Sequence, residues 1–418
     1  MDINAKETSL LRRGIRFTKR IVRFILALIS IVFGVLLICL CLLWLEHKTS
    51  LTLPKPTGQF AISRTSYIWV DTKQVDSLAP HPGTKRELAV WIWYPSEKGK
   101  LSPITDNYMP GQWLTAINKN RGGLNGNFLT RDLSKVHGHS ILSSGVSEKQ
   151  KSYPVVIIRA GLSALTLEYS VLAEDLASQG YIVVGFDAPY RTSLVVFPDG
   201  RVISRTPENN PETLPNEKQQ QALTKLMTGW CDDTKFVLDQ LEYLNTFDSS
   251  GRFTGKIDTT RIGIFGHSLG GATAAQFCHD DERCKAGIDI DGALHGSVLT
   301  DGLQKPFMFI TSDYGNKLDL ANGQIRSDIR SLYNRLPEKD RLWITILGAR
   351  HFNYSDMALL KDRYIFRLFG ALGPIDQRKA LGITSSYVRN FFNLYLKDST
   401  DTLFKKNPSI YSEVKFEP

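Results

Sequence analysis

Cysteine is scarce in this sequence, with five in 418 residues. Five residues separate Cys278 from Cys284, and no paired histidines accompany them as in a zinc-binding motif. Cys39 and Cys41 fall in a long apolar run, and Cys231 stands alone in a helical pattern. The pattern therefore excludes a zinc-finger class of protein, and we expect neither a metal nor a cofactor.

Outside its first residues the chain has only a small basic surplus. Its formal net charge is +9, but residues 1–23 alone hold seven Lys/Arg and two acidic residues. The basic character is thus mostly an N-terminal property. It does not indicate a nucleic-acid partner, and we expect none.

Long hydrophobic runs are absent except over residues 24–45, which carry no charge. As a helix this segment spans about 33 Å, enough to cross a bilayer core. The run is too long for a signal peptide, and no small-x-small cleavage site follows Leu45. We therefore predict a permanent signal anchor at 24–45. The positive-inside rule makes residues 1–23 a cytoplasmic N-terminus and places the rest of this single-pass protein outside the cytoplasm.

The remaining chain is predicted to be a short linker, 46–60, and one domain, 61–418, without internal repeats. Compact apolar runs alternate with helical patterns in this domain, at 154–158, 181–186, 286–290, 307–310 and 342–347. Such alternation predicts an α/β fold with a mostly parallel, doubly wound sheet and helices on both faces. Residues 96–150 and 193–216 are polar and rich in turn formers, so we expect loops or a cover around a site there.

The central motif is residues 261–271, Arg-Ile-Gly-Ile-Phe-Gly-His-Ser-Leu-Gly-Gly. An apolar strand pattern ends in Gly-x-Ser-x-Gly, and helix-forming residues follow. This is the nucleophile elbow of α/β-hydrolases, in which Ser268 stands at the apex of a sharp turn. Gly266 and Gly270 are expected where side chains would collide across the turn.

A serine nucleophile needs a base, and that base needs an orienting acid. The chain order in this fold is Ser, Asp/Glu, His, and only three histidines follow Ser268, namely His279, His295 and His351. His351 directly follows the last predicted strand, where the fold places its base. We therefore predict that His351 is the catalytic base.

Two carboxylates compete for the role of the acid. Asp291 follows the strand after the elbow, and Asp313 follows the next strand. Asp289 lies deeper in its strand, further from an imidazole at the rim. The sequence pattern alone leaves Asp291 and Asp313 as alternatives.

Two backbone amides should form an oxyanion hole. One is expected from Leu269, directly after the serine, and the other from Leu162 in the loop after an earlier strand. If the domain lies outside the cytoplasm, Cys278 and Cys284 are expected to form a disulfide; the alternative is two separate buried thiols.

These motifs resemble those of the platelet-activating factor acetylhydrolase family (plasma/type II, with bacterial members). The resemblance rests on Gly-His-Ser-Leu-Gly-Gly, Ile-Asp-Ile-Asp-Gly-Ala and Gly-Ala-Arg-His-Phe, and extends over about residues 60–400. It implies an α/β-hydrolase that cleaves short or oxidised acyl chains from phospholipid-like esters without calcium. It also implies Asp291 as the acid, with Asp313 structural. One departure is Ala160, where many members have a histidine.

We therefore expect a membrane-anchored serine esterase or lipase with an acyl-enzyme intermediate, acting on lipid or small esters, platelet-activating factor among them. One alternative is a general carboxylesterase or a dienelactone-hydrolase-like enzyme. A non-enzymatic alternative is a catalytically silent envelope binding protein with the hydrolase fold, but no triad member is missing.

Overall fold

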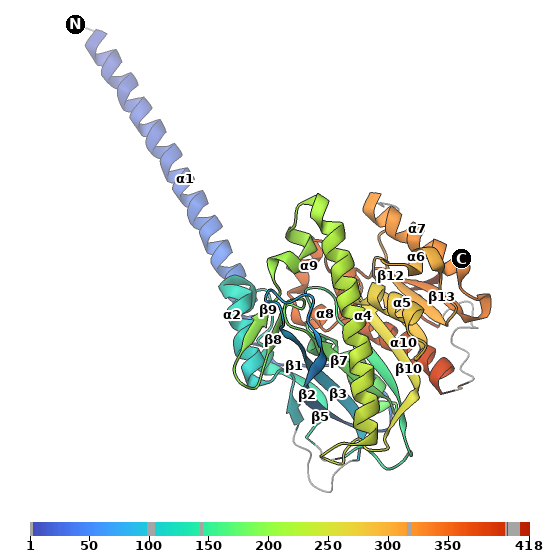
Figure 1. Ribbon diagram of the computed structural model, residues 1–418. Helices are drawn as coiled ribbons and strands as arrows, with labels where there is room; N and C mark the ends of the chain where they lie inside the picture. The colour runs from blue at the N-terminus through green and yellow to red at the C-terminus, as the bar shows by residue number, and fades with distance from the viewer. Residues whose placement is uncertain (1–2, 98–104, 143–144, 316–319, 398, 400–409) are drawn as a thin grey trace.

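The computed structural model describes residues 3–97, 105–142, 145–315, 320–397, 399 and 410–418. These residues form a sheet of twelve strands and a separate two-stranded hairpin (Figure 1). Across the sheet the strands are β1 (Leu51–Thr52), β5 (Val136–Ile141), β2 (Ala61–Val75), β3 (Lys85–Ser96), β7 (Ile182–Asp187), β6 (Tyr153–Arg159), β10 (Ile257–His267), β11 (Cys284–Ile290), β12 (Phe307–Ser312), β13 (Arg341–Ile346) and β14 (Val414–Phe416), with β4 (Thr105–Asn107) beside β5.

The centre of the sheet is parallel. Every neighbouring pair from β7 to β13 runs in the same direction, whereas β2–β3, β3–β7 and β13–β14 are antiparallel. A parallel arrangement brings the carboxyl ends of the central strands to one edge. The predicted mostly parallel α/β sheet is confirmed.

Helices cover both faces because the side chains of each central strand alternate between two cores. In β6, Val155 and Ile157 join the core under α4 (Asn216–Thr246), α5 (Leu269–Asp280) and α7 (Leu320–Arg335). Val156 and Ile158 join the core under α3 (Ser170–Ser178) and α10 (Gln377–Leu396). Each strand is therefore buried on both sides and reads as a continuous apolar run.

The segments expected as loops or a cover contain regular elements. Residues 96–150 include β4, α2 (Gly111–Asn127) and β5, while 98–104 and 143–144 lie outside the described residues. Residues 193–216 form the hairpin β8 (Leu194–Val196) and β9 (Val202–Ser204), then two short 3-10 turns. The remaining short helices are η1 (Leu133–Lys135), η2 (Thr166–Tyr169), η3 (Pro207–Asn209), η4 (Pro211–Thr213), α6 (Val298–Asp301), η5 (Glu338–Asp340), η6 (His351–Tyr354), α8 (Met357–Leu360) and α9 (Arg363–Leu368).

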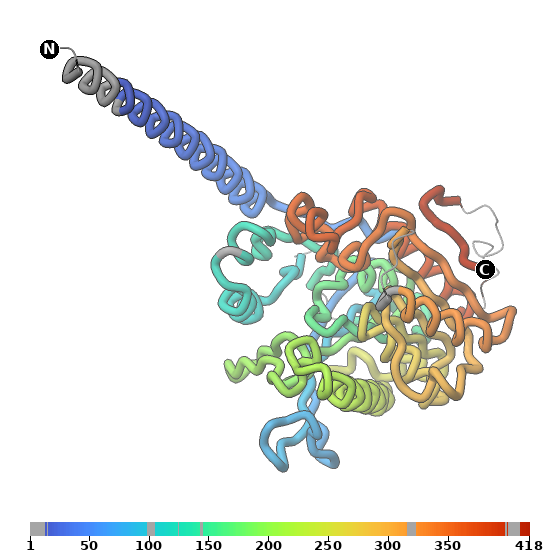
Figure 2. Tube along the Cα trace, turned by 90° about the horizontal axis from the view of Figure 1, so that it is seen from above, coloured from blue at the N-terminus to red at the C-terminus, as the bar shows by residue number. Residues whose placement is uncertain are grey.

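The N-terminal segment is one long helix, α1 (Ile3–Lys48), which projects away from the domain (Figure 2). Within the described residues, one segment, Arg16–Lys48, is long and apolar enough to cross a membrane, and none of its most apolar window is buried in the protein. Membrane anchors and signal sequences both have this character.

Residues 46–60, expected as a linker, fold onto the domain. The Nδ1 atom of His47 lies 2.6 Å from the carbonyl oxygen of Thr130. Leu51 and Leu53 are buried, and β1 pairs with β5. Two isolated leucines among lysine and proline gave no periodic signal in the sequence, so this packing could not be read from it.

Candidate active site

Ser268 lies in a strained turn between β10 and α5. Its φ is 59° and its ψ is −129°, a conformation that side-chain-bearing residues rarely adopt. A Cβ atom on Gly266 would lie 2.0 Å from the carbonyl oxygen of Gly270, and one on Gly270 would lie 2.2 Å from that of Arg159. The two glycines therefore permit the close crossing of strand, turn and helix that exposes the serine.

His351 opens η6, just beyond β13, and faces Asp291 at the end of β11. The Nδ1 atom of the imidazole lies 2.7 Å from Oδ2 of Asp291. The other carboxylate oxygen accepts a hydrogen bond of 2.8 Å from the amide of Ser312. Burial alone would raise the pKa of Asp291, but the hydrogen bonds from His351 and Ser312 outweigh it and lower this pKa. The carboxylate is thus ionised behind the imidazole ring.

The rival carboxylates are bonded elsewhere. Asp313 accepts hydrogen bonds of 2.9 Å from the amides of Gly315 and Gly348, so it braces the loop that precedes His351. Asp289 accepts one of 2.9 Å from the amide of Gly292. Burial, and then the nearby charge of Asp291, raise the pKa of Asp289 well above its ordinary value. Of the three carboxyl groups, Asp291 is the one that contacts the His351 ring.

Ser268 and His351 line one cavity of about 300 Å³, together with Gly161, Leu162, Phe352 and Met357. A Cβ atom on Gly161 would lie 3.2 Å from that of Ser268, so the loop after β6 closely approaches the nucleophile. The cavity therefore gathers the carboxyl ends of β6, β10 and β13.

The amides expected for the oxyanion hole lie beside this cavity. Leu269 is the first residue of α5, and the first amides of a helix have no acceptor within it. The amide of Gly161 donates to the hydroxyl of Tyr169 at 3.2 Å, so it is already engaged. Arg205 donates to the carbonyl oxygen of Leu162 at 2.8 Å and holds the Leu162–Ser163 peptide, which directly follows the peptide that carries the Leu162 amide.

A family model described as "Platelet-activating factor acetylhydrolase, isoform II" matches residues 47–194 and 220–408. The chain belongs to this family. The platelet-activating factor acetylhydrolase of Cavia porcellus is 24% identical over 368 residues, covering 82% of this chain and 78% of the relative. The probable 1-alkyl-2-acetylglycerophosphocholine esterase of Arthroderma benhamiae is 27% identical over 280 residues, covering 63% and 66%.

A solved ferulic acid esterase from Streptomyces cinnamoneus matches with a TM-score of 0.73 and 24% identity, covering 88% of this chain and all of that one. This likeness confirms the α/β-hydrolase fold. Taken with the family match, it identifies this acetylhydrolase-family member as an enzyme that hydrolyses carboxylic esters.

Three residues near Ser268, namely His267, Tyr169 and Arg205, had no assigned role in the sequence analysis. His267 precedes the serine, and its Nδ1 lies 2.8 Å from the hydroxyl of Tyr169. The ring centroids of His267 and His351 are 4.5 Å apart. Burial, followed by the proximity of His351, lowers the pKa of His267 to about 3, so it stays neutral. The place of His267 inside Gly-x-Ser-x-Gly could have marked it as a residue of the site. No sequence motif marks Tyr169 or Arg205.

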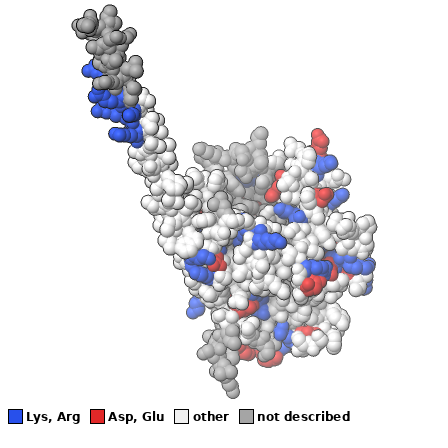
Figure 3. All heavy atoms as spheres, turned by 90° about the vertical axis from the view of Figure 1, so that its left-hand side faces the viewer, with Lys and Arg blue, Asp and Glu red and all other residues white. Residues whose placement is uncertain are grey.

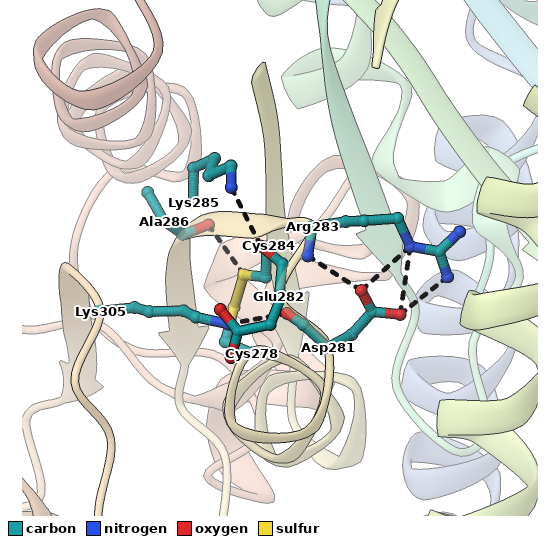
Figure 4. The surroundings of a disulfide bond; sticks show 8 residues. All are labelled: Cys278, Asp281, Glu282, Arg283, Cys284, Lys285, Ala286 and Lys305. Atoms are coloured by element: carbon teal, nitrogen blue, oxygen red, sulfur yellow. Dashed lines mark hydrogen bonds and ion pairs between the residues drawn. A yellow bond between two sulfur atoms is a disulfide. The ribbon is translucent and has the colours of Figure 1, made fainter. Parts of the chain in front are cut away.

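The other cysteine and histidine candidates lie away from the cavity. Cys278 and Cys284 form a disulfide between the end of α5 and the start of β11 (Figure 4). His279 faces the carbonyl oxygen of Gly302 at 2.9 Å, and His295 lines a different pocket. Among the residues that the structure describes, no three His, Cys, Asp or Glu side chains lie together as a metal site would require.

Proposed function

We propose that Ser268, His351 and Asp291 form the catalytic triad of this ester hydrolase. The observation that carries the proposal is the 2.7 Å contact between the imidazole of His351 and the carboxylate of Asp291, beside a cavity that Ser268 also lines. With Nδ1 held by the carboxylate, Nε2 is the nitrogen available to the serine hydroxyl. This contact supports Asp291 as the acid, as the family resemblance implies, over Asp313, which the sequence pattern alone leaves as an alternative.

In this mechanism the hydroxyl oxygen of Ser268 attacks the ester carbonyl as His351 removes its proton. The amides of Leu162 and Leu269 stabilise the negative oxygen of the tetrahedral intermediate. The protonated imidazole gives its proton to the departing alcohol, leaving an acyl-serine ester. Water, deprotonated by His351, then releases the carboxylic acid and restores the serine. Asp291 orients the ring and stabilises its positive form.

The proposed substrates are short or oxidised acyl esters, including those of phospholipids such as platelet-activating factor. The names of the relatives support this class, because one refers to platelet-activating factor and another to a 1-alkyl-2-acetylglycerophosphocholine. The cavity beside the serine, about 300 Å³ and lined by Leu162, Phe352 and Met357, suits a short acyl chain.

Labelling with a fluorophosphonate tests the nucleophile. We expect one covalent adduct, located by peptide mass spectrometry on Ser268, and no adduct in Ser268→Ala. Esterase activity should disappear with the same kinetics as the label appears. A folded enzyme that hydrolyses acetyl esters but carries its adduct on another serine would contradict the proposal.

We also propose that residues 24–45 anchor the enzyme in a membrane. The exposed side chains of this part of α1 are apolar, and a cluster of Lys and Arg lies at its N-terminal side (Figure 3). This charge asymmetry supports a cytoplasmic N-terminus, with the domain of residues 61–418 outside.

Topology can be tested with intact cells. A membrane-impermeant thiol reagent should label a cysteine introduced at Thr72, in the domain, and not one introduced at Ser9. The purified membrane protein should retain residues 1–45 by mass spectrometry. Loss of these residues would show a cleaved signal sequence instead.

A further inference from the structure

A second pocket adjoins the one that contains the serine. Its volume is about 370 Å³, and it is lined by residues of α2, the η2 region and the segment that joins α8 to α9. Ser163, Phe352 and Met357 line both pockets. A molecule whose ester lies at Ser268 can therefore extend into this second pocket, which we call the lysine pocket after Lys361.

Lys361 lines this pocket and is a buried cation, with only 7% of its surface exposed. Its Nζ atom donates to two neutral acceptors, Oδ1 of Asn125 at 3.1 Å and Oγ1 of Thr130 at 2.9 Å. An ammonium group has three N–H donors, so one remains after these two bonds. Buried charges are normally paired, and a lysine with neutral partners alone is uncommon.

The carboxylate that lines the pocket is not available as a counter-ion for Lys361. Glu168 forms an ion pair with Arg121 and accepts a hydrogen bond of 2.9 Å from the amide of Leu165. Among the residues that the structure describes, Lys361 has no ion-pair partner of its own. Burial, then repulsion from Arg121, lower the pKa of Lys361 to about 8, and this is the change that a bound anion would reverse.

We propose that the lysine pocket binds an anionic group of the substrate while its ester is attacked by Ser268. A compact ammonium suits a phosphodiester or a carboxylate, each of which would supply the missing counter-charge. The apolar ring of Phe366 lies beside the ammonium, with its centroid 5.3 Å from Nζ, and lowers the local dielectric, which strengthens an ionic contact there. The inference rests on the proposed esterase function and narrows its substrates to esters that carry an anion.

The pocket also lies next to the base of α1. The hydroxyl of Thr130 accepts from Lys361, while its carbonyl oxygen contacts His47 in the last turn of that helix. If α1 spans a membrane, an anionic group held at Lys361 lies close to the membrane surface from which a lipid substrate arrives. In a glycerolipid substrate, a phosphodiester on the third glycerol oxygen would be such an anionic group at the membrane surface.

The test uses the full chain in neutral detergent and three esters with matched parts. The first is a neutral 2-acetyl glyceryl ether. The second adds a methyl phosphodiester to the glycerol, and the third replaces acetyl by a short acyl chain that ends in a carboxylate. For each variant the measured quantity is kcat/KM on an anionic ester divided by kcat/KM on the neutral ester.

Lys361→Met should lower this ratio about tenfold through KM, and Lys361→Arg should restore most of it. The anionic ester that responds identifies whether the anion lies on the alcohol or the acyl side. Lys397→Met is the matched control, because Lys397 is also a partly buried lysine on a neutral acceptor, the carbonyl oxygen of Gln179 at 2.7 Å. Lys397 lies near the amino end of β7, whereas Ser268 lies at the carboxyl ends of the central strands. The Lys397→Met variant should therefore leave the ratio unchanged.

If Lys361→Met leaves the ratio unchanged and lowers kcat/KM equally on all three esters, the inference is overturned. Lys361 would then only stabilise the end of α2 and the loop after it, through Asn125 and Thr130. If Lys361→Met does not fold, Lys361→Gln, which retains hydrogen bonding to Asn125 and Thr130, carries the same comparison. A wild-type enzyme that hydrolyses none of the esters, or a fully active Ser268→Ala, would instead contradict the proposed function.

Discussion

The two ends of the β10–α5–β11 unit are built differently. At the carboxyl end, Ser268 and Asp291 both have positive φ values, 59° and 52°. At the other end the Cys278–Cys284 disulfide joins α5 to β11, and Arg283 forms an ion pair with Asp281 (Figure 4). Arg283 also forms an ion pair with Asp239. Positive φ at such residues costs about 1–3 kcal/mol each and persists only when the surroundings impose it.

If Ser268 and Asp291 act as proposed, this one unit serves both stability and chemistry. The end with the Cys278–Cys284 disulfide, which we call the stapled end, fixes α5 against β11. The end with Ser268 and Asp291, which we call the strained end, presents a hydroxyl and a carboxylate where the central strands finish. Changes at the strained end should therefore alter activity far more than stability. Changes at the stapled end should do the opposite.

The largest expected effect is at the strained end. Ser268→Ala should lower kcat by about 10⁵- to 10⁶-fold, since removing a triad nucleophile in a serine hydrolase has this effect. The melting temperature should change little, because alanine fits the same turn. Steady-state kinetics on an acetyl ester measures the loss; residual activity above one per cent of wild type would contradict the assignment.

Removing the disulfide at the stapled end should lower the stability of the protein. Replacing both Cys278 and Cys284 by alanine removes a cross-link over a sequence separation of six and should lower the free energy of unfolding by about 2 kcal/mol. The value of kcat/KM at 25 °C should stay within twofold. Chemical denaturation measures the first quantity. A variant that keeps its stability and loses its activity would invert the comparison between the two ends.

A smaller effect on activity is expected from the cover segment. Arg205→Met removes the hydrogen bond to the carbonyl oxygen of Leu162, which holds the peptide next to the proposed oxyanion amide, and should lower kcat by up to roughly tenfold, the value of one charge-assisted hydrogen bond. Arg201→Met is the control, because Arg201 lies beside the same hairpin but pairs with Glu87 and Asp199. Equal losses in the two variants would show a general disturbance of the hairpin.

The smallest expected effect is at Asp289, only two residues before Asp291. Its raised pKa means that the folded protein keeps a proton that the unfolded chain releases above pH 4. The stability of the wild type should therefore fall as pH rises from about 4 toward that raised pKa. Asp289→Asn should reduce this fall and retain kcat within twofold, as urea unfolding at pH 5 and 8 and kinetics would show. A large loss of kcat would make Asp289 part of the mechanism.

Local sequence patterns predicted much of this arrangement. The strained turn at Ser268 is predicted by a strand, two glycines and a helix signal, all within residues 261–271, and the central strands are predicted by their apolar runs. Asp291 and Asp313 could not be separated in this way. Both directly follow strands, and which one meets His351 depends on how the loop after β13 turns.

Contacts between residues that are far apart in the chain could not be predicted from the sequence. Arg205, Tyr169 and Lys361 come from segments without motifs, and each acquires its neighbours only when distant elements meet. The burial of Leu51 and Leu53 arises in the same way, from pairing of β1 with β5 far along the chain. No spacing in the sequence records such contacts.

The most direct test of the account compares Asp291→Asn with Asp313→Asn. Asparagine fits both positions, but only at 291 does it remove the negative charge behind the His351 ring. We expect kcat/KM on an acetyl ester to fall about 10⁴-fold in Asp291→Asn and less than tenfold in Asp313→Asn. Equal losses, or a greater loss in Asp313→Asn, would contradict the triad proposed here.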